Sequence, residues 1–584
     1  MKTILYHSNN SRALTGFGKH CKNVLKYLQK TGKYKLIEFA NGAHWSAPIH
    51  TNKPWKCVGS IPDGQNTPSD QQQARALHYG SAGIDKAIRE FKPDIYIGVE
   101  DIWAFNGYWD KPWWNNINHI IWTTLDSQPI LPQALEAAPK TKNFFVWSSF
   151  AERDMVKEGH DHVKTLHGTV NTEDFYRLSD IERFQLRNKF NLVGDYIVGF
   201  VFRNQLRKSV PNLLDGFKMF QKDCPKAKLL LHTHWSEGWD IPRLIQEKEI
   251  DYKDVLTTYF CKACKRYEIR PFSGQEQNCN HCGAEKTLNT TNVSEGVDEE
   301  QLNEIYNIMD VYCHPFTSGG MEIPIFEAKL TELPTLVTNY SCGEDSCTAE
   351  SGGFPLEWAE YREPGTQFIK ASTYPASIAK QLKKVWKLKP QKLKEIGKKA
   401  RNFTLDNYSI EAIGKKLEEI LDNLPEVDYS FMEKENISDE NSILSSNDTS
   451  ESAWKIRIDY FKKFTRPGKK LCIIMPDSAG DVLWINSLIE NTKKLYPEYD
   501  IYISTKPNLF SYIEDHPDVF KCIPIINLPG QDQTIRLEGI GDKDGAFDIV
   551  FSPFITTKAF ISYTHNGIDR TVYNHYENLN QSIK

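Results

Sequence analysis

Short apolar runs alternate with helical segments through the first third of the chain. The strand-like runs lie at residues 95–98, 119–124 and 144–148, and the helical segments lie at 133–138 and 150–158. An earlier strand-like run opens the chain, and the helix after it has Val24, Leu25 and Leu28 on one face. Strand and helix in this order predict a parallel sheet with helices on both faces. We expect this doubly wound α/β domain to span residues 1–175.

The same alternation resumes near Asp195 and predicts a second domain over residues 176–424. Its apolar runs YIVGFV and VYCHP are typical of buried strands, and Leu302 and Met309 belong to a helically spaced stretch before the second run. The pattern places the end of this sheet near Phe368. The predicted fold class is therefore α/β, with two Rossmann-like domains built on doubly wound parallel sheets. We expect the last helix of the second domain to return to the first.

The composition changes between residues 425 and 453. Residues 426–452 hold eight acidic residues and one lysine, a net charge of −7, and few apolar residues. Such a segment buries too little apolar surface to offset the entropy lost on ordering, so we expect a flexible acidic linker. Residues 454–584 then begin a new strand, turn and helix pattern with LCIIMPDSAGDVLWI. This pattern predicts a third, partial Rossmann-like domain.

The overall composition is that of a soluble globular protein with several domains. The chain has 584 residues, of which 40% are hydrophobic, 12% aromatic and 25% charged. No apolar run approaches the ~20 residues that a transmembrane helix needs. The opening MKTILYHS is too short and too polar for a signal peptide. Most cysteines are scattered singly on apolar segments, which favours reduced thiols and a cytoplasmic location.

Four of the twelve cysteines form a separate pattern. Cys261 and Cys264 make one Cys-x-x-Cys pair, and Cys279 and Cys282 make a second pair after 14 intervening residues. Two such pairs can place four thiolates on one tetrahedral ion, and so small a segment has no other means of burying a core. We predict a zinc ribbon at residues 258–288. The zinc is expected to be structural, because four sulfur ligands leave no open coordination position.

A strand, a glycine loop and a helix follow one another within residues 311–345. Because Gly319 and Gly320 lack Cβ atoms, an anion can approach backbone N–H groups at the start of the helix. Phosphate is the anion that such a loop favours. Glu327 lies in the first turns of the helix, where a carboxylate suits the hydroxyls of a ribose. The stretch therefore indicates a nucleotide site.

The segment PIFEA at residues 324–328 resembles the donor-binding signature of retaining glycosyltransferases of family 4, which have the GT-B fold. The resemblance runs from the first strand to about residue 424. It implies that Glu327 binds the ribose of a nucleotide sugar. The sequence departs from the family pattern at Gly319, where the family has a glutamate that contacts the transferred sugar. Glu322 is the nearest substitute for that glutamate.

Two further pairs of residues match landmarks of the same family. Arg203 and Lys208 have the spacing of the pair that holds the donor diphosphate, and they follow an apolar strand. Two fixed cations would stabilise the charge that develops on the diphosphate as it leaves. Gly16 and Gly18 lie where the family has a glycine loop facing the diphosphate. A Gly-x-Gly pair also fits an ordinary tight turn.

Asp126 keeps the carboxylate of a segment that is His-Asp-x-x-Pro in the family. Leu125 replaces the histidine of that segment, and Pro129 ends it. The resemblance implies a catalytic role for Asp126. The alternative is an aspartate that only caps the turn before the proline.

These resemblances predict a glycosyltransferase that uses a nucleotide-diphosphate sugar, with retention, and transfers to a glycan or lipid-linked acceptor. No catalytic divalent metal is expected, since the cations and glycine loops supply the charge. One alternative is transfer to a hydroxymethyl base in DNA, as in bacterial viruses, which the zinc ribbon suggests. Another is a non-catalytic nucleotide-sugar-binding or scaffold protein, which Leu125 and Gly319 suggest. The third domain resembles the first half of a family 9, heptosyltransferase-type enzyme, and implies an acceptor-binding or structural appendage.

Overall fold

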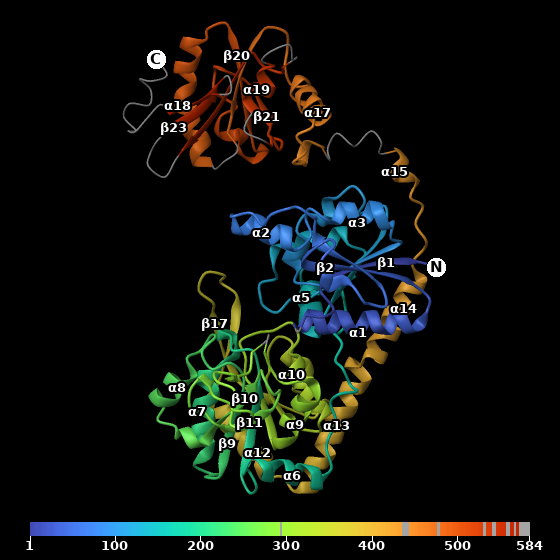
Figure 1. Cartoon of the computed structure of the whole chain (residues 1–584), viewed down its shortest axis with the longest axis vertical. Helices are drawn as coiled ribbons and strands as arrows, with labels where there is room; N and C mark the ends of the chain where they lie inside the picture. Colours follow the sequence, from blue (N-terminus) through green and yellow to red (C-terminus); the bar gives the residue numbers. More distant parts are fainter. Residues whose placement is uncertain are drawn as a thin grey trace. The chain divides into compact units, whose positions relative to one another are not determined.

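The computed structural model describes residues 1–13, 15–292, 295–434, 443–475, 479–529, 533–539, 545–555, 561–565 and 568–571. These residues belong to two compact units, Met1–Val427 and Asp428–Lys584, which we call unit 1 and unit 2. Unit 1 contains two large sheets and unit 2 contains one (Figure 1). Among the described residues, no helix combines the length and the apolar character needed to cross a membrane.

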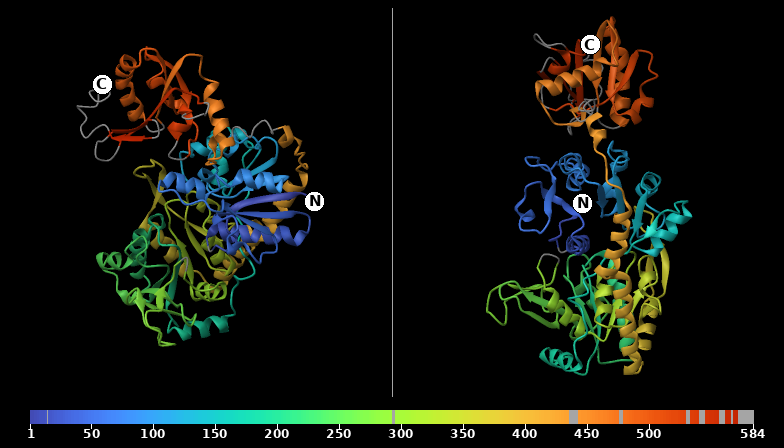
Figure 2. Two further views of the ribbon diagram at one scale, coloured as in Figure 1. Left: turned by 45° about the horizontal axis from the view of Figure 1, so that its top comes forward. Right: turned by 90° about the vertical axis from the view of Figure 1, so that its right-hand side faces the viewer.

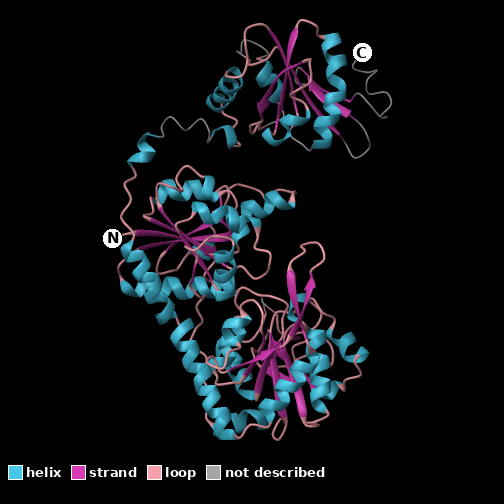
Figure 3. Ribbon diagram, turned by 180° about the vertical axis from the view of Figure 1, so that it is seen from behind, coloured by secondary structure: helices cyan, strands magenta, loops and turns pink. Residues whose placement is uncertain are grey.

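The first sheet of unit 1 has seven parallel strands in the order β3-β2-β1-β4-β5-β6-β7. The strands are β1 Thr3–Asn9, β2 Lys35–His44, β3 Lys56–Ile61, β4 Ile95–Gly98, β5 Asn118–Thr123, β6 Asn143–Val146 and β7 Lys164–Thr165. The helices are α1 Gly16–Thr31, α2 Gln71–His78, α3 Ile84–Phe91, α4 Pro132–Ala137 and α5 Ser149–Lys157. Helices lie on both faces of the sheet (Figure 3). Its central strands are mostly apolar, because both of their faces are buried.

The second sheet of unit 1 has a parallel part in the order β10-β9-β8-β14-β15-β16. Its strands are β8 Tyr196–Val201, β9 Ala227–His232, β10 Val255–Cys261, β14 Val311–His314, β15 Thr335–Thr338 and β16 Gly353–Leu356. The helices around it are α6 Asp180–Lys189, α7 Val210–Gln221, α8 Ile241–Glu247, α9 Glu299–Ile308, α10 Ile323–Leu330, α11 Gly343–Ser346 and α12 Pro375–Trp386. The predicted α/β class with parallel sheets is therefore confirmed.

Two features extend the second sheet beyond the predicted pattern. Antiparallel strands β11 Tyr267–Pro271, β12 Glu276–Gln277 and β13 Leu288–Thr290 form the four-cysteine insert on the end of β10. The expected sheet ending near Phe368 is wrong, because the sheet ends at β16. Strands β17 Trp358–Arg362 and β18 Ile369–Thr373 instead pair with each other in a hairpin that projects from the domain (Figure 1).

Two long helices, α13 Pro390–Tyr408 and α14 Ile410–Asn423, run along both halves of unit 1 (Figure 2). Ile413, Leu417 and Leu421 of α14 share a buried cluster with the apolar face of α1. Lys33 adds an ion pair with Glu418 at 2.5 Å. The contact between α14 and α1 therefore ties the end of unit 1 to its first sheet.

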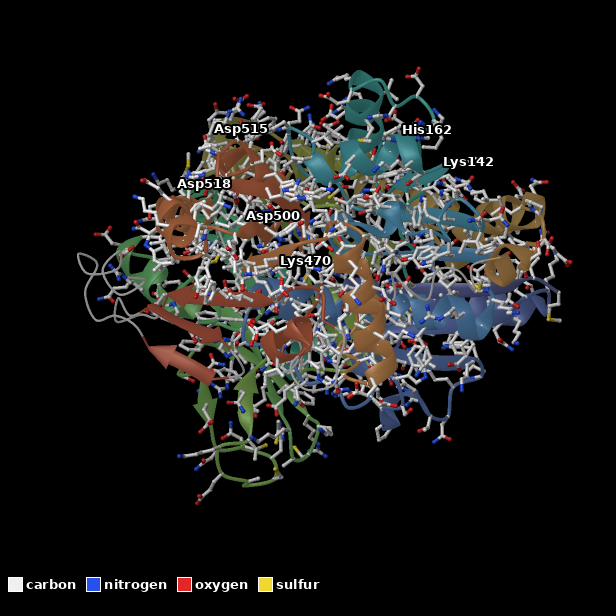
Figure 4. All side chains as sticks on the ribbon, turned by 90° about the horizontal axis from the view of Figure 1, so that it is seen from above. Lys142, His162, Lys470, Asp500, Asp515 and Asp518 are labelled. Atoms are coloured by element: carbon white, nitrogen blue, oxygen red, sulfur yellow. The ribbon has the colours of Figure 1, made fainter. Side chains whose placement is uncertain are left out.

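Unit 2 has the strand order β21-β20-β19-β22-β23-β24, with the first four strands parallel and the last two antiparallel. Its elements are α15 Ser430–Lys434, α17 Glu451–Lys462, β19 Lys469–Ile474, α18 Ala479–Leu495, β20 Tyr499–Thr505, β21 Val519–Pro524, α19 Gln533–Glu538, β22 Ile549–Ile555, β23 Ile561–His565 and β24 Ile568–Thr571. Lys470 and Asp500 are register partners at the start of β19 and β20 (Figure 4).

The segment predicted to be a linker is only partly described, since residues 435–442 lie outside the described residues. The stretch after it packs onto unit 2. Buried Arg457 of α17 donates hydrogen bonds to the carbonyls of Ile443, Ser446 and Asp448 at 2.7–2.9 Å. The negative composition of this stretch did not reveal these contacts with Arg457, because backbone carbonyl oxygens make them.

Candidate functional site

A cavity of about 780 Å³ lies in unit 1 between the start of α1 and the carboxyl ends of β8 and β9. The start of α10 also lines the cavity, and α10 lies beside α1 (Figure 1). Five of the predicted site residues line it, namely Gly16, Arg203, Lys208, Glu322 and Glu327. The fold thus brings together residues that are far apart in the sequence. Gly18, Asp126, Gly319 and Gly320 are not among its lining residues.

An ion cluster around the buried carboxylate of Glu322 lines the cavity. Arg207 and Lys208, at the end of a short 3-10 turn after β8, both donate to the carboxylate of Glu322. His314 approaches the same carboxylate, with Nε2 at 3.2 Å from Oε2. Burial opposes ionisation of Glu322, but the two cations outweigh it and lower its pKa well below the usual value. Its carboxylate therefore holds these two cations in place.

The cluster leaves a net positive charge. Burial lowers the pKa of His314 to about 4, so its ring is neutral. Burial, with the charge of Arg207 adding to it, lowers the pKa of Lys208 to about 8. Two cations and one carboxylate thus remain near neutral pH, and an anion entering the cavity would find one uncompensated positive charge.

Arg203 lies apart from this cluster. Its Nη2 is 2.8 Å from Oε1 of Glu237, and both residues line the cavity. The predicted pair, Arg203 and Lys208, is therefore present in one cavity, but Arg207 is the cation that shares a carboxylate with Lys208. Sequence reasoning missed Arg207, although the neighbouring Arg-Lys pair was a signal for it.

Glu327 is buried on α10, where its carboxylate has two partners. The hydroxyl of Tyr306 donates to Oε2 at 2.8 Å, and Nζ of Lys19 lies 3.7 Å from Oε1. Lys19 also forms an ion pair with Glu299 at 3.1 Å. Burial and the nearby Glu299 raise the pKa of Glu327, although Lys19 opposes them. Sequence reasoning missed Lys19, which lies one turn after Gly16 and reaches across the cavity from α1.

The two glycine segments differ in their surroundings. Gly16 starts α1 and lines the cavity, whereas the N–H of Gly18 donates to Oγ1 of Thr15 at 3.1 Å and caps the helix. A Cβ on Gly320 would lie 2.3 Å from Cβ of Thr124 in the first domain. A Cβ on Gly319 would lie 2.6 Å from Oε1 of Glu322. Close packing therefore requires glycine at both positions of the second loop.

Asp126 lies at the seam between the two halves of unit 1. Its Oδ2 accepts a hydrogen bond from Oγ of Ser318 at 3.0 Å, and Nζ of Lys370 is 3.9 Å from Oδ1. Lys370 also donates to Ser318 at 2.6 Å. Asp126 is thus joined to the loop that carries Gly319. Leu125 is buried beside it.

The four predicted metal ligands converge. Sγ of Cys261 is 3.8 Å from that of Cys282, and Sγ of Cys264 is 3.7 Å from that of Cys279. A tetrahedral ion with zinc–sulfur bonds of ~2.3 Å would separate its ligands by about 3.8 Å. The N–H groups of Cys264 and His281 point at the Sγ atoms of Cys261 and Cys279. These contacts stabilise thiolates, so the residues fit a zinc ion.

The sequence matches no protein-family model and no curated protein. Sucrose-phosphate synthase from Thermosynechococcus elongatus has a similar structure, with a TM-score of 0.53 and 14% identity over 73% of this chain and 99% of that one. A glycosyltransferase from Rickettsia africae gives 0.50 and 15% identity over 72% and 97% of the two chains. The N-terminal domain of Candida albicans trehalose-6-phosphate phosphatase gives 0.50 and 12% identity over 72% and 97%. At these identities the likeness shows the fold, which is GT-B.

Proposed function

We propose that this chain is a glycosyltransferase that takes its sugar from a nucleotide-diphosphate donor and retains the anomeric configuration. The observation that carries the proposal is the cavity where Lys208, Glu322 and Glu327 of the second domain face Gly16 of α1. In open α/β folds, ligands bind at the carboxyl ends of the strands, and this cavity lies at such ends. The resemblance to family 4 supports retention.

In this proposal the diphosphate lies beside Arg207 and Lys208, in the cavity that Arg203 also lines. Fixed cations in a buried site stabilise charge that grows on the leaving diphosphate without reorganisation during the reaction. Glu327 accepts hydrogen bonds from the ribose hydroxyls, and Lys19 steadies its charge. In a front-face reaction, a donor phosphate oxygen receives the acceptor proton, so the protein supplies geometry and positive charge rather than a base.

The acceptor is proposed to be a glycan or a lipid-linked sugar that binds at the carboxyl edge of the first sheet. Glu100 and Asp101 follow β4 there, and Asp126 follows β5. Nζ of Lys370 lies near Asp126, and Oγ1 of Thr124 donates to Asp101 at 2.6 Å. Carboxylates at this edge suit the hydroxyl groups of a sugar, since a carboxylate accepts several hydrogen bonds.

We also propose that the four cysteines hold one structural zinc ion. When bound, zinc would fix the antiparallel strands of the insert, which has only a small apolar cluster around Tyr259, Cys261 and Leu288. Four thiolates leave no position for substrate, so the ion would have no part in the transfer.

The test is incubation of the purified full chain with UDP-, GDP- and ADP-sugars and measurement of nucleotide release with and without candidate glycans. We expect release from one donor class, and NMR of the product should show the anomeric configuration of the donor. Glu327→Gln keeps the size of the side chain and removes its charge, so it should reduce this release without changing the shape of the cavity. Binding without turnover would favour the non-catalytic alternative, and absence of binding to every donor would reject the proposal.

A further inference from the structure

The four-cysteine insert forms part of the wall of the cavity. Phe260 on β10 and Lys265 in the first Cys-x-x-Cys turn both line it, together with His232 and Thr233 at the end of β9. Nζ of Lys265 lies 5.6 Å from the centre of the Phe260 ring. The insert therefore presents an aromatic ring and a neighbouring cation to the same space as Glu327.

The geometry of β10 couples this wall to the cysteine cluster. Successive side chains of a strand point to opposite faces, so Tyr259 and Cys261 share one face and Phe260 has the other. Tyr259 and Cys261 pack in the small core of the insert, whereas Phe260 packs in the large core of the second domain. The first metal ligand and the ring that lines the cavity are therefore adjacent residues of one strand.

The turn that carries Lys265 is held on two sides. The N–H of Lys265 donates to the carbonyl of Cys261 at 2.9 Å, which closes the turn around the first two cysteines. Its carbonyl accepts a hydrogen bond from Nε2 of Gln301 on α9 at 2.9 Å. A metal ion that fixes Cys261 and Cys264 would thus fix the backbone of Lys265 against α9.

Ion pairs connect the residues that line the cavity. Lys208 pairs with Glu322, and Lys19 links Glu327 on α10 to Glu299 at the start of α9. Gln301 on the same helix contacts the insert. A nucleotide with its phosphates at Lys208 and its ribose at Glu327 would direct its base toward the insert.

Two buried polar atoms beside the insert have no hydrogen-bond partner among the described residues. They are Nδ1 of His232 and Oγ1 of Thr233, and both residues are at least nine-tenths buried and line the cavity. A buried polar atom without a partner costs stability, and a bound ligand that hydrogen-bonds to these atoms would remove that cost. A nucleobase has ring nitrogens and exocyclic groups that fit this need.

We propose that the insert is a nucleobase-recognition element of the donor site, in which Phe260 and Lys265 contact the base and the metal ion holds them in place. This inference rests on the proposed function, because it takes the ligand to be the nucleoside diphosphate of a donor. It assigns the insert a role in selecting the nucleotide, whereas the cations near Lys208 bind any diphosphate.

The test is calorimetric titration of the full chain with UDP, GDP, ADP and inorganic pyrophosphate. Lys265→Ala should weaken the nucleoside diphosphate that binds best about threefold to tenfold and leave pyrophosphate unchanged. Lys262→Ala is the matched control, because Lys262 is an exposed lysine of the same turn that does not line the cavity. Metal content is measured for each variant, so that a lost contact is distinguished from a lost ion.

A second variant tests the role of the metal. Cys279→Ser should lower the bound zinc and weaken the nucleoside diphosphate, again more than pyrophosphate. If Lys265→Ala and Lys262→Ala both bind nucleotide like the wild type, the inference fails while the proposed function stands. If the wild type binds none of the three nucleotides, the proposed function and the inference both fail.

Discussion

The two sheets of unit 1 have different side chains at their carboxyl edges, acidic ones on the first sheet and basic ones on the second. After β4 and β5 the first sheet has Glu100, Asp101 and Asp126, whereas the turn after β8 in the second sheet has Arg207 and Lys208. Burial raises the pKa of Glu100 to about 8 and also raises the pKa of Asp101. Two domains of one architecture therefore offer different chemistry at equivalent places.

We relate this difference to the proposed function, in which one domain binds the donor diphosphate and the other binds the acceptor. A diphosphate is attracted by fixed cations, so on the proposed function it binds at the second edge. A sugar acceptor is neutral and rich in hydroxyl groups, which suits the first edge. The shared architecture places both edges at one seam, and the residues after each strand decide what binds there.

The largest effect should come from removing the donor contacts. Lys208→Ala and Glu327→Ala should each lower kcat/KM roughly 10²–10³-fold, because the first removes a charge that acts on the leaving diphosphate and the second removes the ribose contact. Asp101→Asn on the first sheet should leave nucleotide affinity within about twofold. Steady-state kinetics and calorimetry measure both, and thermal melting checks that the variants fold. Equal losses of nucleotide affinity from substitutions at both edges would show that the two edges do not differ in donor binding.

Loss of the metal should have the next largest effect. Cys261→Ser or Cys279→Ser should remove the single zinc expected per chain, as measured by elemental analysis, and locally unfold the insert. We expect transfer to fall about tenfold rather than to vanish, because the wall loosens while Lys208 and Glu327 stay in place. Freshly purified wild-type protein without zinc would contradict the assignment. Complete loss of transfer in a folded variant would indicate a catalytic ion instead.

The affinity for the donor should depend on pH through Lys208. Its pKa is lowered to about 8 by burial, and only the protonated amine attracts phosphate. Affinity for a nucleotide sugar, whose diphosphate does not titrate in this range, should therefore fall as pH rises above 8, by at most about tenfold per pH unit. Lys208→Arg keeps its charge and should flatten the profile. A constant wild-type affinity from pH 7 to 9.5 would contradict this role.

Truncation should have the smallest effect. A fragment ending at Val427 keeps both edges, the cavity and the hydrogen bond from the N–H of Val427 to Asp94 at 2.9 Å. Nucleotide affinity and donor hydrolysis should stay within about twofold of the full chain, since the site lies in unit 1. A selective loss of acceptor use would assign unit 2 to acceptor recognition. Loss of donor binding in a folded fragment would show that unit 2 contributes to the donor site.

The sequence was most informative where a local pattern determines the structure. Apolar runs such as VYCHP predicted β14, and the alternation with helical segments predicted two parallel sheets. The spacing of Cys261, Cys264, Cys279 and Cys282 predicted a cluster, because each pair closes its own turn and only the pairing of the turns is long-range.

The sequence was least informative where contacts depend on how the two domains meet. Lys19 reaches Glu327 only because α1 lies beside α10, and nothing near Lys19 in the sequence indicates that. The hairpin of β17 and β18 was missed because its strands alternate polar and apolar residues, as a strand of the main sheet can. In the structure these two strands pair with each other. Neither feature has a short-range signal.

A crystal structure of the full chain, soaked with the nucleoside diphosphate that it binds, would show whether the diphosphate lies at the edge of the second sheet. We expect phosphate oxygens within hydrogen-bond distance of Nζ of Lys208 and ribose hydroxyls on the carboxylate of Glu327. A nucleotide bound instead at the edge of the first sheet, beside Glu100 and Asp101, would contradict this expectation.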